Sequence, residues 1–154
     1  MKSFVSSIAI LLAISSTIAC NKSDDDSTTP PATGNKTWKL GTTTYTVNNY
    51  ARASETFQAY DAAGNGIHFS FATFPTTGGN YNVVNSSATL GANDVSILAF
   101  GSNSGTSYFS TGNDNTVATV RIIGTSTLGI TLPDTWVAKP GADSLKLSAN
   151  LGDL

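Results

Sequence analysis

Apolar and polar residues alternate along the chain from Trp38 to its C-terminal part. This period of two is typical of strands with one buried and one exposed face, and no long window keeps the i, i+3, i+4 spacing of an amphipathic helix. The pattern predicts strands at residues 37–47, 54–60, 67–74, 81–84, 95–100, 106–110, 116–123, 127–132, 135–139 and 144–151. We therefore expect an all-β domain.

Turn residues separate these predicted strands. Asn65-Gly66 favours a hairpin between residues 54–60 and 67–74 because both residues tolerate positive φ. The other breaks combine Gly or Pro with Asn, Asp or Ser, as in Pro140-Gly-Ala-Asp143. Short strands at such regular spacing indicate an antiparallel β-sandwich or, as an alternative, a small β-barrel, and the sequence does not choose between them.

The alternation also predicts which side chains form the core. Three inward sets stand out: Ile67, Phe69 and Phe71; Leu128, Ile130 and Leu132; and Leu145, Leu147, Ala149 and Leu151. The last set is the longest. We therefore expect the C-terminal strand to be structural, so that its removal would unfold the domain.

The first 35 residues have a different composition. Lys2 is followed by an apolar stretch, broken by Ser and Thr, that ends at Ala19. The stretch falls short of the roughly 20 apolar residues of a membrane span, and its layout is that of a secretory signal peptide over residues 1–19. Residues 27–34 hold no apolar side chain larger than alanine, so we expect residues 20–35 to form a disordered tether and residues 36–154 a single domain.

Two motifs near Cys20 resemble signals of bacterial lipoproteins. The segment Thr17-Ile18-Ala19-Cys20 resembles a lipobox, with Thr17 where leucine is usual, and it implies a lipid anchor on Cys20. Asp24, Asp25 and Asp26 resemble the acidic export signal of Bacteroidota surface lipoproteins, which implies an outer-membrane protein exposed at the cell surface. The alternatives are a secreted protein with one unpaired cysteine and an acidic run that serves only as a spacer.

Charge and titratable residues exclude several classes of function. Residues 36–154 carry six Lys or Arg against seven Asp or Glu, which leaves no basic surface for a nucleic-acid partner. The same part of the chain has one histidine, His68, which falls on the polar side of its strand and is expected at the surface. We therefore predict no enzyme activity, no cofactor and no zinc site.

Calcium is a weak option at two acidic turns. Asp61 with Asn65, and the segment Gly112-Asn-Asp-Asn115, supply hard oxygen atoms. Neither turn has the ligand count of a dedicated calcium site, and Asn and Asp are ordinary turn residues. The sequence therefore predicts no metal site.

Two hypotheses for the function follow. The first is a binding module for a glycan, a peptide or an envelope protein, and the second is a structural or accessory part of an envelope assembly. Trp136 is the candidate ligand-binding residue because Pro133 suggests a strand break or edge nearby. An indole at that position can also close the end of the core, and the sequence slightly favours this second role.

Aromatic residues and two serines complete the candidates. Trp38, Tyr45, Tyr50, Tyr60, Tyr81 and Tyr108 could bind a ligand or fill the core. The tripeptides that begin at Asp26 and Asp143 resemble the O-glycosylation acceptor pattern of the same bacterial group. That resemblance implies candidate modification at Ser27 and Ser144.

Overall fold

The computed structural model describes residues 36–102, 105–123 and 127–152. The predictions for the signal peptide, Cys20, the acidic run at 24–26, Ser27 and the tether lie outside these residues. The described residues form eleven strands and no helix, so the prediction of an all-β domain is confirmed. The strands are β1 (Thr37–Leu40), β2 (Thr43–Thr46), β3 (Asn49–Ala53), β4 (Thr56–Tyr60), β5 (Gly66–Phe71), β6 (Gly79–Val83), β7 (Asp94–Phe100), β8 (Ser107–Ser110), β9 (Val117–Ile122), β10 (Leu128–Ala138) and β11 (Ser144–Leu151).

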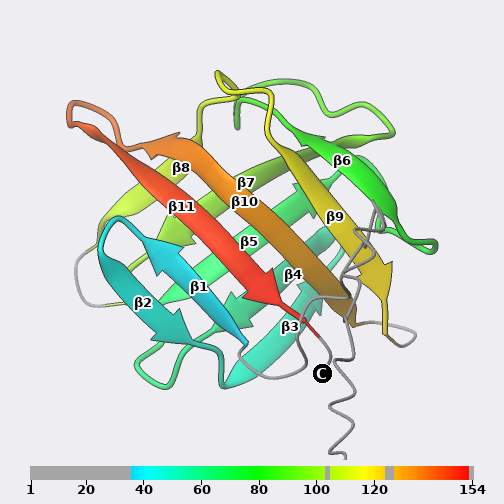
Figure 1. The fold of residues 1–154 in the computed structure, drawn as a ribbon, viewed down its shortest axis with the longest axis horizontal. Coiled ribbons are helices and arrows are strands. Elements are labelled where there is room, and N and C mark those ends of the chain that lie inside the picture. The colour runs from blue at the N-terminus through cyan, green and yellow to red at the C-terminus, as the bar shows by residue number, and fades with distance from the viewer. Residues whose placement is uncertain (1–35, 103–104, 124–126, 153–154) are drawn as a thin grey trace, which may run out of the picture.

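The strands are arranged in two layers that face each other (Figure 1). They are hydrogen-bonded in the order β2-β1-β11-β10-β9-β6-β7-β5-β4-β3. The front layer in the figure holds β2, β1, β11, β10 and β9, and the back layer holds β7, β5, β4 and β3. Strand β6 joins the layers through β9 and β7, and β8 joins them through β10 and β7. The five strands β10, β9, β6, β7 and β8 thus close a hydrogen-bonded ring.

One strand pair differs from the expected antiparallel pattern. Strands β6 and β7 run parallel, whereas every other pair in the described part of the chain is antiparallel. The connection over residues 84–93 carries the chain back before β7 begins, as a parallel pair requires. The sheet is therefore mixed.

The core lies between the layers and contains the predicted inward sets. Phe57, Phe69 and Ile97 from the back layer are at most 1% exposed, as are Trp38 and Leu147 from the front layer. Of the predicted core residues, only Leu145 is partly exposed. Strand β11 lies between β1 and β10, which agrees with the structural role expected for it.

The predicted strand at residues 37–47 is in fact two strands. Strands β1 and β2 form a hairpin that turns at Gly41, whose φ is +59°. Residues 41–44 carry no apolar side chain, and the apolar positions change phase across them, from Trp38 and Leu40 to Tyr45 and Val47, so the prediction of one strand overlooked a turn that the pattern does mark. Strand β3 was not predicted, because Asn49–Ala53 carries no strong apolar alternation. It pairs with β4 and ends the sheet.

The break predicted at Pro133 is instead a bulge inside one long strand. Leu132 lies opposite Ala149 and Thr135 lies opposite Leu147, so three steps along β10 match two steps along β11. A bulge is one of the few strand positions that accept proline, which has no N–H to donate. Residues 127–132 and 135–139 therefore belong to a single strand, β10.

Candidate functional site

The bulge determines where Trp136 points. Without it, the inward alternation of Leu128, Ile130 and Leu132 would continue to Trp136 and bury the indole. The extra residue shifts the alternation by one, so that Thr135 and Val137 are buried and Trp136 faces outward. Trp136 is 39% exposed. The preference for a core role was therefore wrong, and the physical reason is the change of phase at Pro133.

The backbone of Trp136 is held by the segment that follows β8. Its N–H donates to Asp114 Oδ2 at 3.0 Å, and its carbonyl oxygen accepts bonds from the N–H and the hydroxyl of Thr111, each at 3.2 Å. This segment bends through positive φ at Gly112 and Asn115. A Cβ on Gly112 would lie 2.6 Å from the backbone nitrogen of Asn85, so only glycine fits there.

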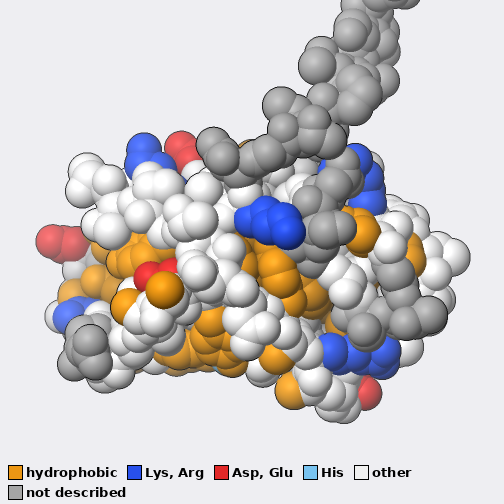
Figure 2. Space-filling view, turned by 90° about the horizontal axis from the view of Figure 1, so that it is seen from below, with side chains coloured by type: hydrophobic (Ala, Val, Ile, Leu, Met, Phe, Trp, Pro, Cys, Tyr) orange, Lys and Arg blue, Asp and Glu red, His pale blue; other side chains and the backbone are white. Residues whose placement is uncertain are grey.

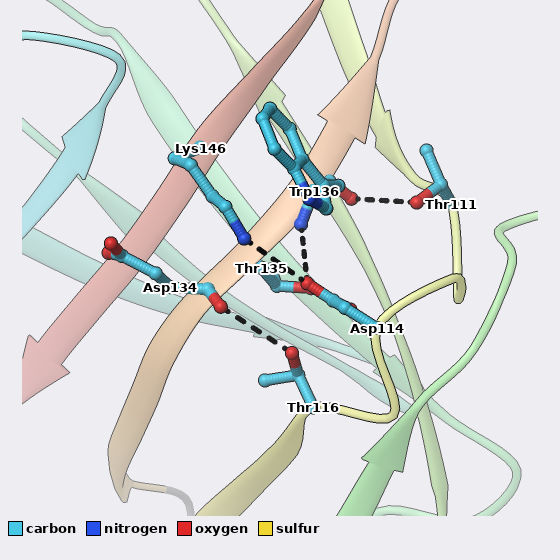
Figure 3. Close-up of polar contacts among 7 residues, drawn as sticks. All are labelled: Thr111, Asp114, Thr116, Asp134, Thr135, Trp136 and Lys146. Carbon is cyan, nitrogen blue, oxygen red and sulfur yellow. Dashed lines mark hydrogen bonds and ion pairs between the residues drawn. The ribbon is translucent and has the colours of Figure 1, made fainter.

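Asp114 connects the side chains of this region (Figure 3). Its carboxylate accepts a hydrogen bond from the hydroxyl of Thr135, which is fully buried, at 3.1 Å. Lys146 on β11 lies 3.6 Å from the carboxylate, and its ammonium nitrogen is 4.3 Å from the centre of the Trp136 ring. Thr116 donates to the carbonyl oxygen of Asp134 at 3.5 Å. Side chains far apart in the sequence thus hold the backbone of Trp136, and Lys146 contacts its outward-facing indole.

The surroundings of Asp114 stabilise its ionised form. Desolvation is the largest single effect and raises the pKa of Asp114, but the other effects together outweigh it. These are hydrogen bonds from Thr116, the Trp136 N–H and Thr135, and the charge of Lys146. The pKa of Asp114 is therefore lowered, and the carboxylate is charged at neutral pH.

An open hollow of about 420 Å³ lies beside the indole. We call it the Trp136 hollow, and it is lined by Thr111, Asn113, Asp114, Trp136 and Ser144. Ser144 is exposed at the start of β11, so one candidate modification site borders the candidate ligand-binding residue. The lining combines an apolar ring with hydroxyl, amide and carboxylate groups, which suits a ligand with both C–H faces and hydroxyls.

Most of the other aromatic candidates are buried or pack against the core. Trp38 is 1% exposed and stacks on Tyr45 with 3.9 Å between ring centres. Tyr45, Tyr50, Tyr81 and Tyr108 are partly buried and pack against the core. Burial raises the pKa of Tyr50 to about 12. These rings therefore fill the domain, and Trp136 differs from them in its exposure.

His68 is less exposed than the sequence predicted. Its ring packs edge-on against Tyr60 and Phe100, with centre distances of 5.6 and 4.9 Å, and its Nε2 lies 3.0 Å from the Tyr60 hydroxyl. That hydroxyl also donates to Gln58 at 2.8 Å. Desolvation in this cluster lowers the pKa of His68. Sequence alternation placed His68 on the outer face correctly but did not reveal that neighbouring rings cover it.

The carboxylate of the acidic turn at Asp61 accepts hydrogen bonds from residues of the same turn. The Asp61 carboxylate accepts bonds from the N–H groups of Ala63 and Asn65 at 2.9 and 2.8 Å, and from the Asn65 side chain at 2.6 Å. Among the residues that the structure describes, no group of three or more His, Cys, Asp or Glu side chains is placed to hold a metal ion. Asp61 therefore shapes the predicted β4–β5 hairpin, in which the positive φ falls on Gly64 (+83°) and not on Asn65 or Gly66, since Gly66 already begins β5.

The surface carries few charged groups. On the face drawn in Figure 2, Lys, Arg, Asp and Glu are scattered among uncharged side chains. Across the described ranges, no helix has the length and apolar character needed to cross a membrane. Comparison with protein-family models, with curated proteins and with solved structures found no match.

Proposed function

We propose that the domain is a non-catalytic glycan-binding module of a surface-exposed outer-membrane lipoprotein. The observation that carries the binding part is the exposed indole of Trp136 beside a hollow lined by polar groups. The lipoprotein part rests on the sequence motifs at Cys20 and at Asp24, Asp25 and Asp26.

The chemistry of the Trp136 hollow suits a sugar better than a purely apolar ligand. A pyranose ring has a C–H face that packs on an aromatic ring and hydroxyls that bond to groups around its edge. Trp136 supplies the ring, and Thr111, Asn113 and Ser144 supply hydroxyl and amide groups. Asp114 holds the backbone of Trp136, and Lys146 contacts the indole ring, so part of the site is ordered before a ligand binds.

The non-catalytic part of the proposal rests on how the titratable groups are used. Asp114, the carboxylate of the hollow, is already bonded to Thr135, Trp136 and Lys146. His68 lies on β5 in the other layer. A general acid or base needs a titratable group that is free to exchange a proton with a bound substrate.

Glycan-array screening of the full chain in detergent, followed by titration calorimetry, tests the binding function. We expect Trp136→Ala to weaken binding at least tenfold while changing the free energy of unfolding by under about 1 kcal/mol, since the side chain is exposed. Ile122→Ala is the matched control because Ile122 is 38% exposed on β9. Absence of glycan binding, or severe destabilisation by Trp136→Ala, would contradict the proposal.

The proposed lipid anchor and surface location are tested separately. Cys20→Ser should release the protein from membranes because it removes the lipid, which contributes about 0.8 kcal/mol per buried CH₂. Replacing Asp24, Asp25 and Asp26 with alanine should leave the lipid in place but hide the domain from protease added to whole cells. Membrane association of Cys20→Ser after a carbonate wash, or equal protease access in both forms, would contradict the respective part.

The second candidate function is a structural component of an envelope assembly. Strands β2 and β3 end the hydrogen-bonded order of the sheet, and each pairs with one neighbour among the described strands. Such edges can pair with a strand of another chain. A partner that protects the backbone amides of β2 or β3 from hydrogen exchange, while leaving Trp136 unaffected, would favour this function.

A further inference from the structure

The outer face of β11 leads from the Trp136 hollow to a second hollow. Ser144, Lys146, Ser148 and Asn150 alternate with more buried residues, so they share the outward side of the strand. Steps of two residues cover about 6.6 Å, which places Asn150 about 13 Å from Lys146 along the strand. The two hollows therefore lie on one continuous face of the front layer.

The second hollow has a volume of about 350 Å³, with apolar groups of Trp38, Leu132 and Ala149 at its base and polar side chains around them. Its outward-facing residues are Thr37, Lys39, Thr44, Thr131, Ser148 and Asn150. Strand pairing sets them side by side: Thr37 and Thr131 both lie opposite Asn150, and Lys39 lies opposite Ser148 and Thr44. Neighbouring strands are about 4.8 Å apart, so hydroxyl and amide groups line this hollow at short, regular intervals.

Lys39 gives the second hollow a positive charge. It lines the hollow together with uncharged groups, and it forms no ion pair with any described residue. The charge at the other end of the face is balanced, because Lys146 is paired with Asp114 at 3.6 Å. Among the residues that the structure describes, the positive charge of this face that has no ion-pair partner is therefore that of Lys39.

Asn150 adds a second polar feature to this hollow. Its Oδ1 is enclosed and accepts no hydrogen bond within the described part of the structure. Buried acceptors usually have a donor. Rotation of this amide toward a bound hydroxyl would supply one.

We propose that the ligand of this face is a linear anionic glycan that crosses β11 obliquely, with one sugar ring on Trp136 on β10 and an anionic unit at Lys39 on β1. This proposal rests on the proposed glycan-binding function and adds the charge, the length and the direction of the ligand. The acidic end avoids Asp114 and meets the Lys39 ammonium group, which has no ion-pair partner in the described part of the chain. A monosaccharide would reach one hollow, whereas a chain of several sugar units spans both.

Calorimetric titration of the full chain with matched tetrasaccharides tests this assignment. The probes are tetragalacturonate and its methyl ester, and a sulfated carrageenan tetrasaccharide and its desulfated form. We expect tighter binding of the anionic member of at least one pair. Lys39→Gln should reduce that binding about threefold to fivefold, as expected for an exposed ion pair, and should leave the neutral member unaffected. Lys139→Gln is the control because Lys139 lines a different hollow.

The outcomes separate the two proposals. Equal affinities for charged and neutral probes, together with no effect of Lys39→Gln, would overturn the anionic assignment and leave glycan binding intact. Binding of a polyglutamate peptide as tightly as the best sugar would overturn the glycan class. If no sugar binds in this titration or on the array, both proposals fail.

Discussion

The outer faces of the two layers are built from the same alternating pattern but have different surfaces. On the back layer, Tyr60, His68 and Phe100 are large, and they pack on one another. On the front layer, the outward side of β1 and β11 carries Thr, Ser, Asn and Lys, which leave hollows between them. On the back layer, large side chains fill the space above the strands and leave no room for a ligand. On the front layer, smaller side chains leave hollows that can receive one.

Gly66 is the residue that allows the back face to close. A Cβ built on Gly66 would lie 2.6 Å from Phe100 Cζ and 3.1 Å from Tyr60 Cδ1, so the rings occupy the space above the glycine. Gly66→Val should displace Phe100 and cost about 1–3 kcal/mol of unfolding free energy, measured by urea denaturation. Gly79→Ala is the control, since its nearest neighbour would be 3.8 Å away. Equal stability of Gly66→Val and the parent would show that the back face is loosely packed.

Asp114 has the corresponding role on the front face, with a smaller expected effect. Asp114→Ala removes the acceptor for the Thr135 hydroxyl, which is fully buried, and should cost about 1–2 kcal/mol. It should also loosen the backbone at Trp136 and release Lys146 from its ion pair, and thereby weaken glycan binding. Asp114→Asn keeps one acceptor oxygen and should lose less stability. If Asp114→Ala left both stability and binding unchanged, the hydrogen bonds in Figure 3 would not be what orients the indole.

The contribution of Asp114 to stability should be lost at low pH. The pKa of Asp114 is lowered in the folded protein, so the unfolded chain takes up its proton first as pH falls. Its stabilising effect is complete above its unfolded value of about 3.9 and is lost as pH falls through the folded value. Urea unfolding below pH 4 should show a shallower loss of stability in Asp114→Asn than in the parent, and identical slopes would contradict the assigned interactions.

The pKa of His68 should report on the packing of the back face, and its effect on stability should appear at a higher pH than that of Asp114. Desolvation lowers its folded pKa below the usual 6.5, so the folded protein resists protonation that the unfolded chain accepts. The contribution of His68 is complete above pH 6.5 and declines as pH falls toward the folded value. Since the chain has one histidine, proton NMR can measure its pKa directly. A value at or above 6.5, or the same stability slope in His68→Gln, would contradict the packed cluster.

The sequence predicted the class of fold and most of the core because alternation is a local property. Ile67, Phe69 and Phe71 were assigned to the inward side from their spacing, and all three are buried. The β1–β2 hairpin was missed although the alternation stops over residues 41–44, because threonine is common in strands and the single glycine there was not taken as a turn. Local patterns reveal which side a residue faces only while the strand stays regular.

The candidate site depends on an irregular and non-local feature. The Pro133 bulge turns Trp136 outward, and the only local sign of it was a proline that indicated a break equally well. Asp114 and Lys146 meet Trp136 from other segments, and no spacing in the sequence could have brought them together. The residue type of Trp136 identified a candidate, but its role required the three-dimensional pairing of β10 with β11.

The central claim is that Trp136 binds the ligand while the filled back face does not. The chain has two tryptophans, Trp38 in the core and Trp136 at the surface, so an NMR spectrum of the ¹⁵N-labelled protein should contain two indole N–H signals. On titration with the best glycan from the array, we expect a shift of the Trp136 indole signal and of the Ser144, Lys146 and Ser148 amides, with the Trp38 signal unchanged. Shifts confined to Tyr60, His68 and Phe100, or to strands β2 and β3, would contradict it.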